Sequence, residues 1–174
     1  MFSDCHWTTE VYRNAFWYKG EIAEIGIPRN DIYFENSDEV NKVVREKFGI
    51  DKETFVILYA PTFRNEKNKE VFIWNYERVI KECSNRLGKD AVMILRLHPN
   101  DASLLDTFAL ENTIINGSSY PDIQELVLMS DMLITDFSSV MFDFLLHFLV
   151  QTFYVLKNAQ LHLAHILLLL FLAL

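Results

Sequence analysis

Short apolar runs alternate with longer amphipathic stretches through the middle of the chain. Apolar and β-branched residues fill four runs that are typical of buried strands, at 55–60, 91–97, 113–116 and 132–136. Apolar residues at helical spacing predict helices at 36–49, 71–88, 101–109, 120–130 and 138–148. Strands that alternate with helices in this way predict an α/β fold, a parallel Rossmann-like sheet with helices on both faces.

The start of the chain has a different pattern. Residues 8–16 could form a short helix capped by Thr8 or Thr9, in a stretch rich in aromatic side chains that suggest packing onto something. Residues 21–34 fit a short strand that ends in a turn. The helix at 36–49 has a capping box from Asn36 to Glu39 and a glycine stop at its end.

The end of the chain is Leu-rich and of low complexity from Leu161 onward. Its unbroken apolar part, 166–174, is shorter than the ~20 residues that a membrane-spanning helix needs. Three interpretations stay open: a C-terminal helix that is buried or covered by a partner, a segment at a membrane surface, and a non-native tail from a truncated or frame-shifted gene.

The charge and the cysteine content of the chain exclude several classes of protein. The net charge of -8 leaves no basic stripe to neutralise nucleic acid phosphates, so we expect no nucleic acid partner. Cys5 and Cys83 lie far apart and form neither a disulfide framework nor a zinc motif, which indicates a reducing compartment. The first twenty residues have neither the basic nor the apolar region of a secretory signal.

The stretch LRLHPN places a cation and an imidazole where a strand ends. Arg96 and His98 follow the run at 91–97, and Pro99 cannot continue the ladder of hydrogen bonds. Right-handed crossovers bring the loops after parallel strands to one edge of the sheet, where ligands bind. No second His, Cys or carboxylate stands at ligand spacing from His98, so we expect no metal. The alternatives are a structural histidine and an arginine paired with an acidic neighbour.

The other loops at this edge add polar groups. The first offers Pro61, Thr62 and Arg64, and Arg64 could clamp a phosphate, although a plain loop has the same composition. The loop before 120–130 supplies Ser118 and Ser119, a weak signal.

The last of these loops, at 136–139, gives the most specific indication of a binding site. Ser138 and Ser139 stand where a helix would begin, so that one hydroxyl can cap it while free N–H groups bind an anion, unless the helix is an ordinary Ser-capped one. Asp136 is better interpreted as a brace for the loop or a contact to sugar hydroxyls. The chain has no Gly-rich phosphate loop, so a phosphate would be held by helix termini and side chains.

Four stretches in this order, GIPRND, ILYAPTFR, LRLHPN and DIQELVLMSDMLITDFSSVMFDF, resemble the CDP-glycerol glycerophosphotransferase family over roughly residues 8–146. The resemblance implies the C-terminal, nucleotide-binding half of a GT-B-type glycosyltransferase. Members of the family transfer glycerol phosphate from CDP-glycerol to the hydroxyl end of a teichoic acid or related polyol-phosphate polymer and release CMP.

The resemblance also implies roles for residues. His98 is expected at the donor pyrophosphate as the catalytic residue, either donating a proton or hydrogen-bonding when neutral. The expected donor-binding residues are Pro61, Thr62, Arg64, Arg96, Ser118, Ser119, Asp136, Ser138 and Ser139. No cofactor and no metal are expected, because cationic side chains and helix N–H groups can stabilise the charge on transferred phosphates.

The resemblance further implies an organisation and partners. We expect the end of a preceding domain and a linker at 1–36, a CDP-donor-binding domain at 37–150 and a divergent tail at 151–174, in which 150–156 could replace the family's next strand. The acceptor domain with its own histidine motif is not in this sequence, so we expect a donor-binding fragment that is inactive alone. The expected location is cytoplasmic, with peripheral contact at the inner membrane face, where a lipid-linked acceptor lies. The alternatives are a GT-B transferase that uses CDP-ribitol or a nucleotide-sugar, and a non-catalytic folded remnant.

Overall fold

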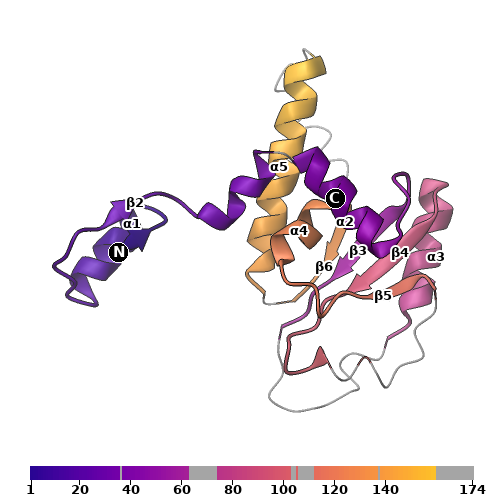
Figure 1. Cartoon of the computed structure of the whole chain (residues 1–174), viewed down its shortest axis with the longest axis horizontal. Helices are drawn as coiled ribbons and strands as arrows, with labels where there is room; N and C mark the ends of the chain where they lie inside the picture. Colours follow the sequence, from indigo (N-terminus) through magenta and orange to yellow (C-terminus); the bar gives the residue numbers. More distant parts are fainter. Residues whose placement is uncertain (36, 63–73, 103–104, 106–111, 137, 160–174) are drawn as a thin grey trace.

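The computed structural model describes residues 1–35, 37–62, 74–102, 105, 112–136 and 138–159, the last ten of these by their backbone alone. The first part of the chain forms β1 (Phe2–Ser3), α1 (His6–Asn14), β2 (Ala23–Glu24), the 3-10 helix η1 (Pro28–Tyr33) and α2 (Ser37–Phe48). The remainder forms β3 (Phe55–Tyr59), α3 (Tyr76–Leu87), β4 (Ala91–Leu95), β5 (Ile114–Asn116), α4 (Ile123–Leu128), β6 (Met132–Ile134) and α5 (Val140–Ala159) (Figure 1).

The central sheet has four parallel strands in the order β5-β4-β3-β6. The chain moves outward from β3 through β4 to β5, and then crosses back to place β6 beside β3. Ile57 of β3 is aligned with Met93 on one side and Met132 on the other. The direction of winding therefore reverses between β3 and β6, which is the position where open α/β sheets bind their ligands.

Helices cover both faces of this sheet, and each face has its own apolar core. On one face, Val56 and Leu58 of β3 pack with residues of α2, α4 and α5. On the other face, Ile57 and Tyr59 of the same strand pack with Ile80 of α3. Successive side chains of β3 point to opposite faces, and both sets are buried, which explains why the strand is apolar throughout. The predicted parallel α/β fold is confirmed.

The helix boundaries follow from local capping. The Asn75 side chain accepts a hydrogen bond from the Arg78 N–H at the start of α3, and Gly88 ends that helix with a φ of 64°. Asp122 caps α4 in the same way by accepting from Gln124 N at 2.8 Å. The capping residue predicted for α2, Asn36, lies outside the described residues, as does most of the helix predicted at 101–109.

The last helix is longer than the sequence pattern predicted. α5 continues to Ala159, so the strand expected at 150–156 is wrong. This run contains neither glycine nor proline, and nothing in it breaks the helix that begins at Val140. Within the described ranges, no helix combines the length and apolarity needed to cross a bilayer.

The first 25 residues form a small unit of their own. β1 and β2 pair in parallel, α1 packs beside them, and the unit stands apart from the central sheet (Figure 1). It buries none of its apolar side chains, and Trp7 and Trp17 are 74% and 77% exposed. The predicted short helix and short strand are both present in it.

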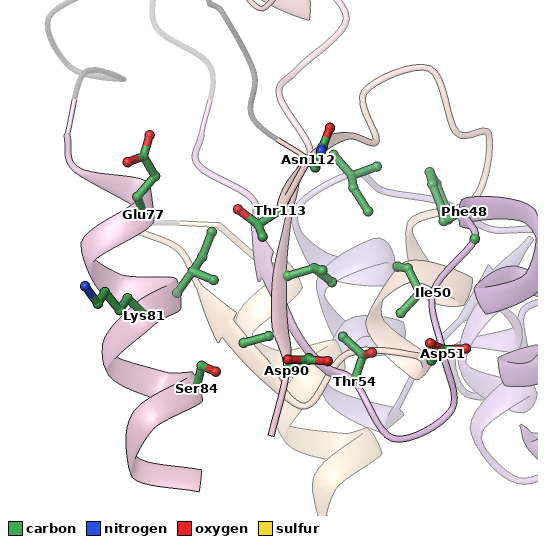
Figure 2. Close-up of a pocket in the computed structure, with 15 residues that line it drawn as sticks. Phe48, Ile50, Asp51, Thr54, Glu77, Lys81, Ser84, Asp90, Asn112 and Thr113 are labelled. Carbon is green, nitrogen blue, oxygen red and sulfur yellow. The ribbon is translucent and has the colours of Figure 1, made fainter. Parts of the chain in front are cut away.

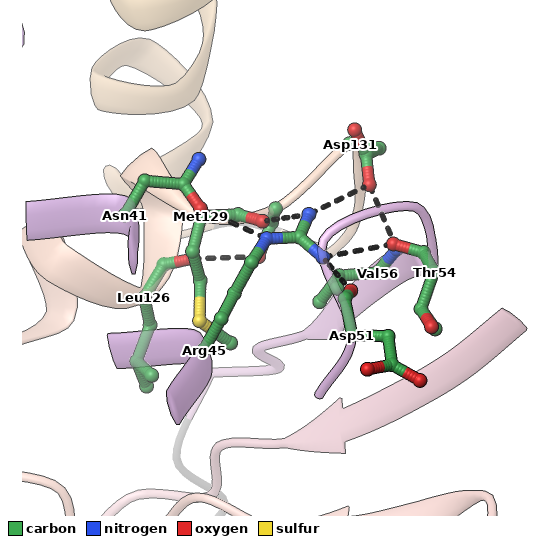
Figure 3. Close-up of polar contacts among 9 residues, drawn as sticks. Asn41, Arg45, Asp51, Thr54, Val56, Leu126, Met129 and Asp131 are labelled. Carbon is green, nitrogen blue, oxygen red and sulfur yellow. Dashed lines mark hydrogen bonds and ion pairs between the residues drawn. The ribbon is translucent and has the colours of Figure 1, made fainter. Parts of the chain in front are cut away.

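At the amino edge of the sheet, the guanidinium of Arg45 joins three separate segments (Figure 3). It donates to the carbonyls of Asp51 at 3.0 Å, Thr54 at 2.9 Å and Met129 at 3.2 Å. It also lies 3.5 Å from the carboxylate of Asp131, which accepts from the backbone N–H of Val56 at 2.8 Å. Arg45 is buried and thereby satisfies carbonyls that no strand partner reaches.

Replacing Arg45 with Met should lower the free energy of unfolding by about 2–4 kcal/mol, because the buried carbonyl of Met129 and the part-buried carbonyls of Asp51 and Thr54 lose a donor. Urea denaturation of the purified chain measures this. Lys42→Met, an exposed change on the same helix, should alter stability by less than about 0.5 kcal/mol. Equal stability of the two variants would contradict this role of Arg45.

On the inner side of α5, a histidine is buried among aromatic rings. His147 is 3% exposed, and its ring centroid lies 5.4 Å from that of Tyr33 and 6.3 Å from that of Phe144. Burial lowers the pKa of His147, and the nearby charge of Asp131 opposes this shift only in part. Folding therefore favours the neutral form of this imidazole.

The unfolded chain takes up a proton at His147 near the ordinary pKa of about 6.5, whereas the folded chain does so only at lower pH. The stability contributed by this site is therefore complete above that value and is lost as the pH falls below it. We predict that the free energy of unfolding falls between pH 7.5 and 5.5, and that His147→Gln makes this dependence shallower. Parallel pH profiles for the two proteins would contradict the prediction.

Candidate functional site

The loops after β3 and β6 meet at the carboxyl edge of the sheet. Ala60 N donates to the Ile134 carbonyl at 3.0 Å, and the Thr135 hydroxyl returns a bond to the Ala60 carbonyl at 2.6 Å. Beyond this pairing, the N–H and the hydroxyl of Thr62 both donate to Oδ1 of Asp136, each at 2.8 Å. Asp136 thus braces the loop after β3, in agreement with the first of the two interpretations that the sequence allowed.

A cavity of about 270 Å³ opens beside these loops. Its wall contains five of the residues predicted from the sequence: Pro61, Thr62, Arg96, His98 and Ser138. The remaining lining residues are Ala60, Leu97, Pro99, Ile123 and Val140. Three loops that are far apart in the sequence therefore contribute to one site.

Arg96 presents a half-buried cation to this cavity. Its backbone N–H donates to the Tyr59 carbonyl at 2.8 Å, and its guanidinium donates to the Ser118 carbonyl. Burial lowers the pKa of Arg96. Among the residues that the structure describes, no carboxylate lies within ion-pair distance of it, so the acidic partner considered from the sequence is not found there. A desolvated guanidinium of this kind favours an anionic ligand.

His98 is exposed at the mouth of the cavity, and its ring is oriented by the turn that follows it. Its Nδ1 accepts the backbone N–H of Asn100 at 3.2 Å, while its carbonyl accepts from Asp101 N at 2.8 Å. The neutral ring therefore carries its proton on Nε2, which makes Nε2 a hydrogen-bond donor.

The start of α5 forms the third wall of the cavity. Ser138 lines the cavity, and its hydroxyl accepts a hydrogen bond from Val140 N, the first residue of the helix, at 3.4 Å. The 20-residue helix behind it places the positive end of its dipole at this wall. Ser139 is exposed and is not part of the wall.

Two of the other predicted residues, both on the loop after β5, lie outside the wall of the cavity. Ser118 is buried behind it, and Ser119 points to solvent on the same loop. Arg64 lies outside the described residues. Ile123 and Val140 also line the cavity, and neither was predicted from the sequence. Their positions in the sequence could have indicated this, because each is the first residue of a helix that follows a loop at the carboxyl edge of the sheet.

A larger cavity of about 630 Å³ lies at the opposite, amino edge (Figure 2). Glu77, Lys81 and Ser84 of α3 contribute to its lining on one side, and Asp51 and Asp90 on the other (Figure 2). Three carboxylates against one ammonium make this cavity unfavourable for a phosphate. The smaller cavity, with its guanidinium and helix start, is therefore the better candidate for an anionic ligand despite its size.

Within the described part of the chain, no three His, Cys, Asp or Glu side chains gather in a group that could hold a metal ion. The cationic groups of the smaller cavity come from Arg96 and the start of α5 instead.

The fold and the smaller cavity define a doubly wound α/β domain with a site for an anionic ligand at its switch point. Residues 1–155 match the family described as CDP-Glycerol:Poly(glycerophosphate) glycerophosphotransferase, and the chain belongs to this family. The family expected from the sequence is thereby confirmed.

Curated relatives of this chain include teichoic acid polymerases. The teichoic acid poly(glycerol phosphate) polymerase of Staphylococcus epidermidis is 38% identical over 149 residues, which cover 83% of this chain and 21% of the relative. The enzyme of the same name from Bacillus subtilis is 35% identical over 147 residues, covering 83% of this chain and 20% of the relative. The chain thus spans about a fifth of the length of these relatives.

Among solved structures, the wall teichoic acid polymerase TagF is similar in both fold and sequence. A TagF variant soaked with CDPG superposes with a TM-score of 0.63 at 39% identity, over 82% of this chain and 34% of that chain. The described domain therefore has the same fold as part of a larger polymerase.

We predict that Asp136→Ala will speed amide hydrogen exchange at Thr62 by at least about tenfold, because this N–H loses its acceptor. Exchange measured by NMR on the folded chain tests this. The matched control is Asp122→Ala, which removes another carboxylate that accepts a backbone N–H at 2.8 Å and should affect Gln124 instead. Unchanged exchange at Thr62 would show that Asp136 does not brace this loop.

Proposed function

We propose that the chain supplies the donor-binding part of a transferase that moves glycerol phosphate from CDP-glycerol to the hydroxyl end of a teichoic acid or related polyol-phosphate polymer, with release of CMP. The observation that carries this proposal is the half-buried guanidinium of Arg96, which faces a cavity shared with His98 and the start of α5 and has no carboxylate partner among the described residues. Family membership supports the choice of donor.

The three groups have complementary tasks in this proposal. Arg96 would bind the diphosphate through the N–H groups that do not contact Ser118, and the positive end of the α5 dipole would add to the charge that the phosphate oxygens meet. Thr62, held by Asp136, would line the other side of the diphosphate. Positive groups fixed in place before the reaction stabilise the charge that grows on the leaving phosphate.

His98 would act at the bond that breaks. In the transfer, the acceptor hydroxyl oxygen attacks the phosphorus of the glycerol phosphate group, and the bond from that phosphorus to the oxygen of CMP breaks. Nε2–H of His98 would donate to the leaving phosphate oxygen, because Nδ1 is engaged with Asn100. The base that takes the proton of the acceptor hydroxyl would come from another part of the whole protein.

The size of the cavity agrees with a site that binds the donor and leaves the acceptor to another part of the protein. About 270 Å³ is at the low end for a ligand pocket, which suits the diphosphate of the donor and leaves the acceptor to other surfaces. We propose that residues 37–150 form the donor domain, that residues 1–36 lead into it from an acceptor domain, and that the chain alone does not polymerise. Without an acceptor held beside the donor, the rate gained from proximity is lost.

The proposed acceptor is a lipid-linked polyol phosphate, which would place the whole enzyme in the cytoplasm at the inner face of the membrane in peripheral contact. The support for this part is the names of the relatives, which are teichoic acid polymerases, and the nature of their polymer as a cell-wall product. Neither a cofactor nor a metal is required by the groups named above.

We predict that CDP-glycerol binds the purified chain and that Arg96→Gln weakens this binding at least about tenfold, since the diphosphate loses its bidentate cation. Isothermal titration of the two proteins measures the change. Arg86→Gln is the matched control, because Arg86 is exposed on α3 and pairs with Glu82. CDP should compete with CDP-glycerol, and UDP should compete less.

Two results would overturn the proposal. One is a folded parent chain that binds neither CDP-glycerol nor CDP. The other is equal binding by the Arg96 and Arg86 variants, which would place the donor somewhere other than this cavity.

A further inference from the structure

We infer that Ser118 is a positioning residue for His98 and Arg96, and that it does not itself contact the donor. Ser118 is 5% exposed and lies outside the wall of the smaller cavity. Its hydroxyl accepts the backbone N–H of Leu97 at 3.1 Å and approaches the carbonyl of Leu95 at 3.4 Å as a donor. Both bonds go to the segment immediately before His98.

The need for this contact follows from where β5 ends. β4 and β5 pair as far as Leu95 and Asn116, after which Gly117 N still donates to the Leu95 carbonyl at 2.8 Å. The chain then turns away toward α4. The next N–H on this side of the chain after β4 belongs to Leu97, and no backbone carbonyl of β5 faces it. The hydroxyl of Ser118 takes the place of that carbonyl, and a buried N–H is thereby paired.

The backbone of Ser118 is itself held at two points. Its backbone N–H donates to Oδ1 of Asn116 at 2.9 Å, and its carbonyl accepts from the guanidinium of Arg96. The turn is also tight, since a Cβ added at Gly117 would lie 2.5 Å from Cγ2 of Ile94. One serine on a rigid turn therefore fixes the guanidinium directly and the imidazole through the backbone of Leu97.

The consequence for donor binding rests on the proposed function, whereas the consequence for the His98 ring does not. Removing the hydroxyl should leave Leu97 N unpaired and let the LRLHPN segment shift, although no donor contact is lost. If Ser118 only stabilised the fold, removing its hydroxyl would lower the free energy of unfolding and leave the ring of His98 where it is.

The test uses the whole chain and compares Ser118→Ala with Ser130→Ala. Ser130 is the matched control, because it is also 5% exposed and its hydroxyl donates to the Leu126 carbonyl at 2.6 Å. The first readout is the NMR signal of the His98 ring without ligand, assigned with His98→Ala. The second is the affinity for CDP-glycerol.

We expect Ser118→Ala to shift the His98 ring and Asn100 amide signals and to weaken CDP-glycerol binding on the order of fivefold, while Ser130→Ala changes neither. Ser118→Thr, which keeps a hydroxyl, should stay near the parent in both readouts. Unchanged His98 signals in folded Ser118→Ala, or equal shifts with Ser130→Ala, would overturn the inference. If the parent binds no CDP-glycerol, the proposed function fails, and the ring signals still decide the role of Ser118.

Discussion

The site depends on how buried backbone groups are paired beyond the ends of the parallel strands. Where a ladder stops, the next N–H has no carbonyl opposite it, and burial without a partner costs free energy. Asp136 meets this need for Thr62 after β3, and Ser118 meets it for Leu97 after β4. Each of these bonds joins two loops that are distant in the sequence, so the same contacts that satisfy the backbone also assemble the cavity.

An arginine that donates to backbone carbonyls stands at each edge of the sheet, but the two arginines have different roles. At the amino edge, Arg45 donates to the carbonyls of three residues, and its charge also lies beside the carboxylate of Asp131. At the carboxyl edge, the guanidinium of Arg96 contacts one carbonyl and faces a cavity. An arginine surrounded by protein acceptors stabilises the fold, whereas one with a single protein acceptor has donors left for a ligand.

The sequence predicted the sheet and the loops because apolar strands and helical periodicity are local signals. The prediction that Arg96, His98 and Ser138 lie at one edge of the sheet is also confirmed, since right-handed crossovers determine where the loops gather. The sequence did not predict which loop residues face inward. Ser118 and Ser138 each begin a Ser-Ser pair, yet the first is buried with its hydroxyl bonded to Leu97 N, and the second lines the cavity. The length of α5 was also missed, since an apolar run without breakers fits a strand or a helix equally well until its neighbours are known.

The most direct test of the central claim is to map the amide signals of the chain by two-dimensional NMR during titration with CDP-glycerol. If the donor binds at the carboxyl edge, the signals of Thr62, Arg96, His98 and Ser138 should move together and saturate at one affinity, while those of residues that line the larger cavity, such as Ser84 and Thr113, should stay in place. Movement confined to Ser84, Thr113 and their neighbours would contradict this claim, because the donor would then bind at the amino edge of the sheet.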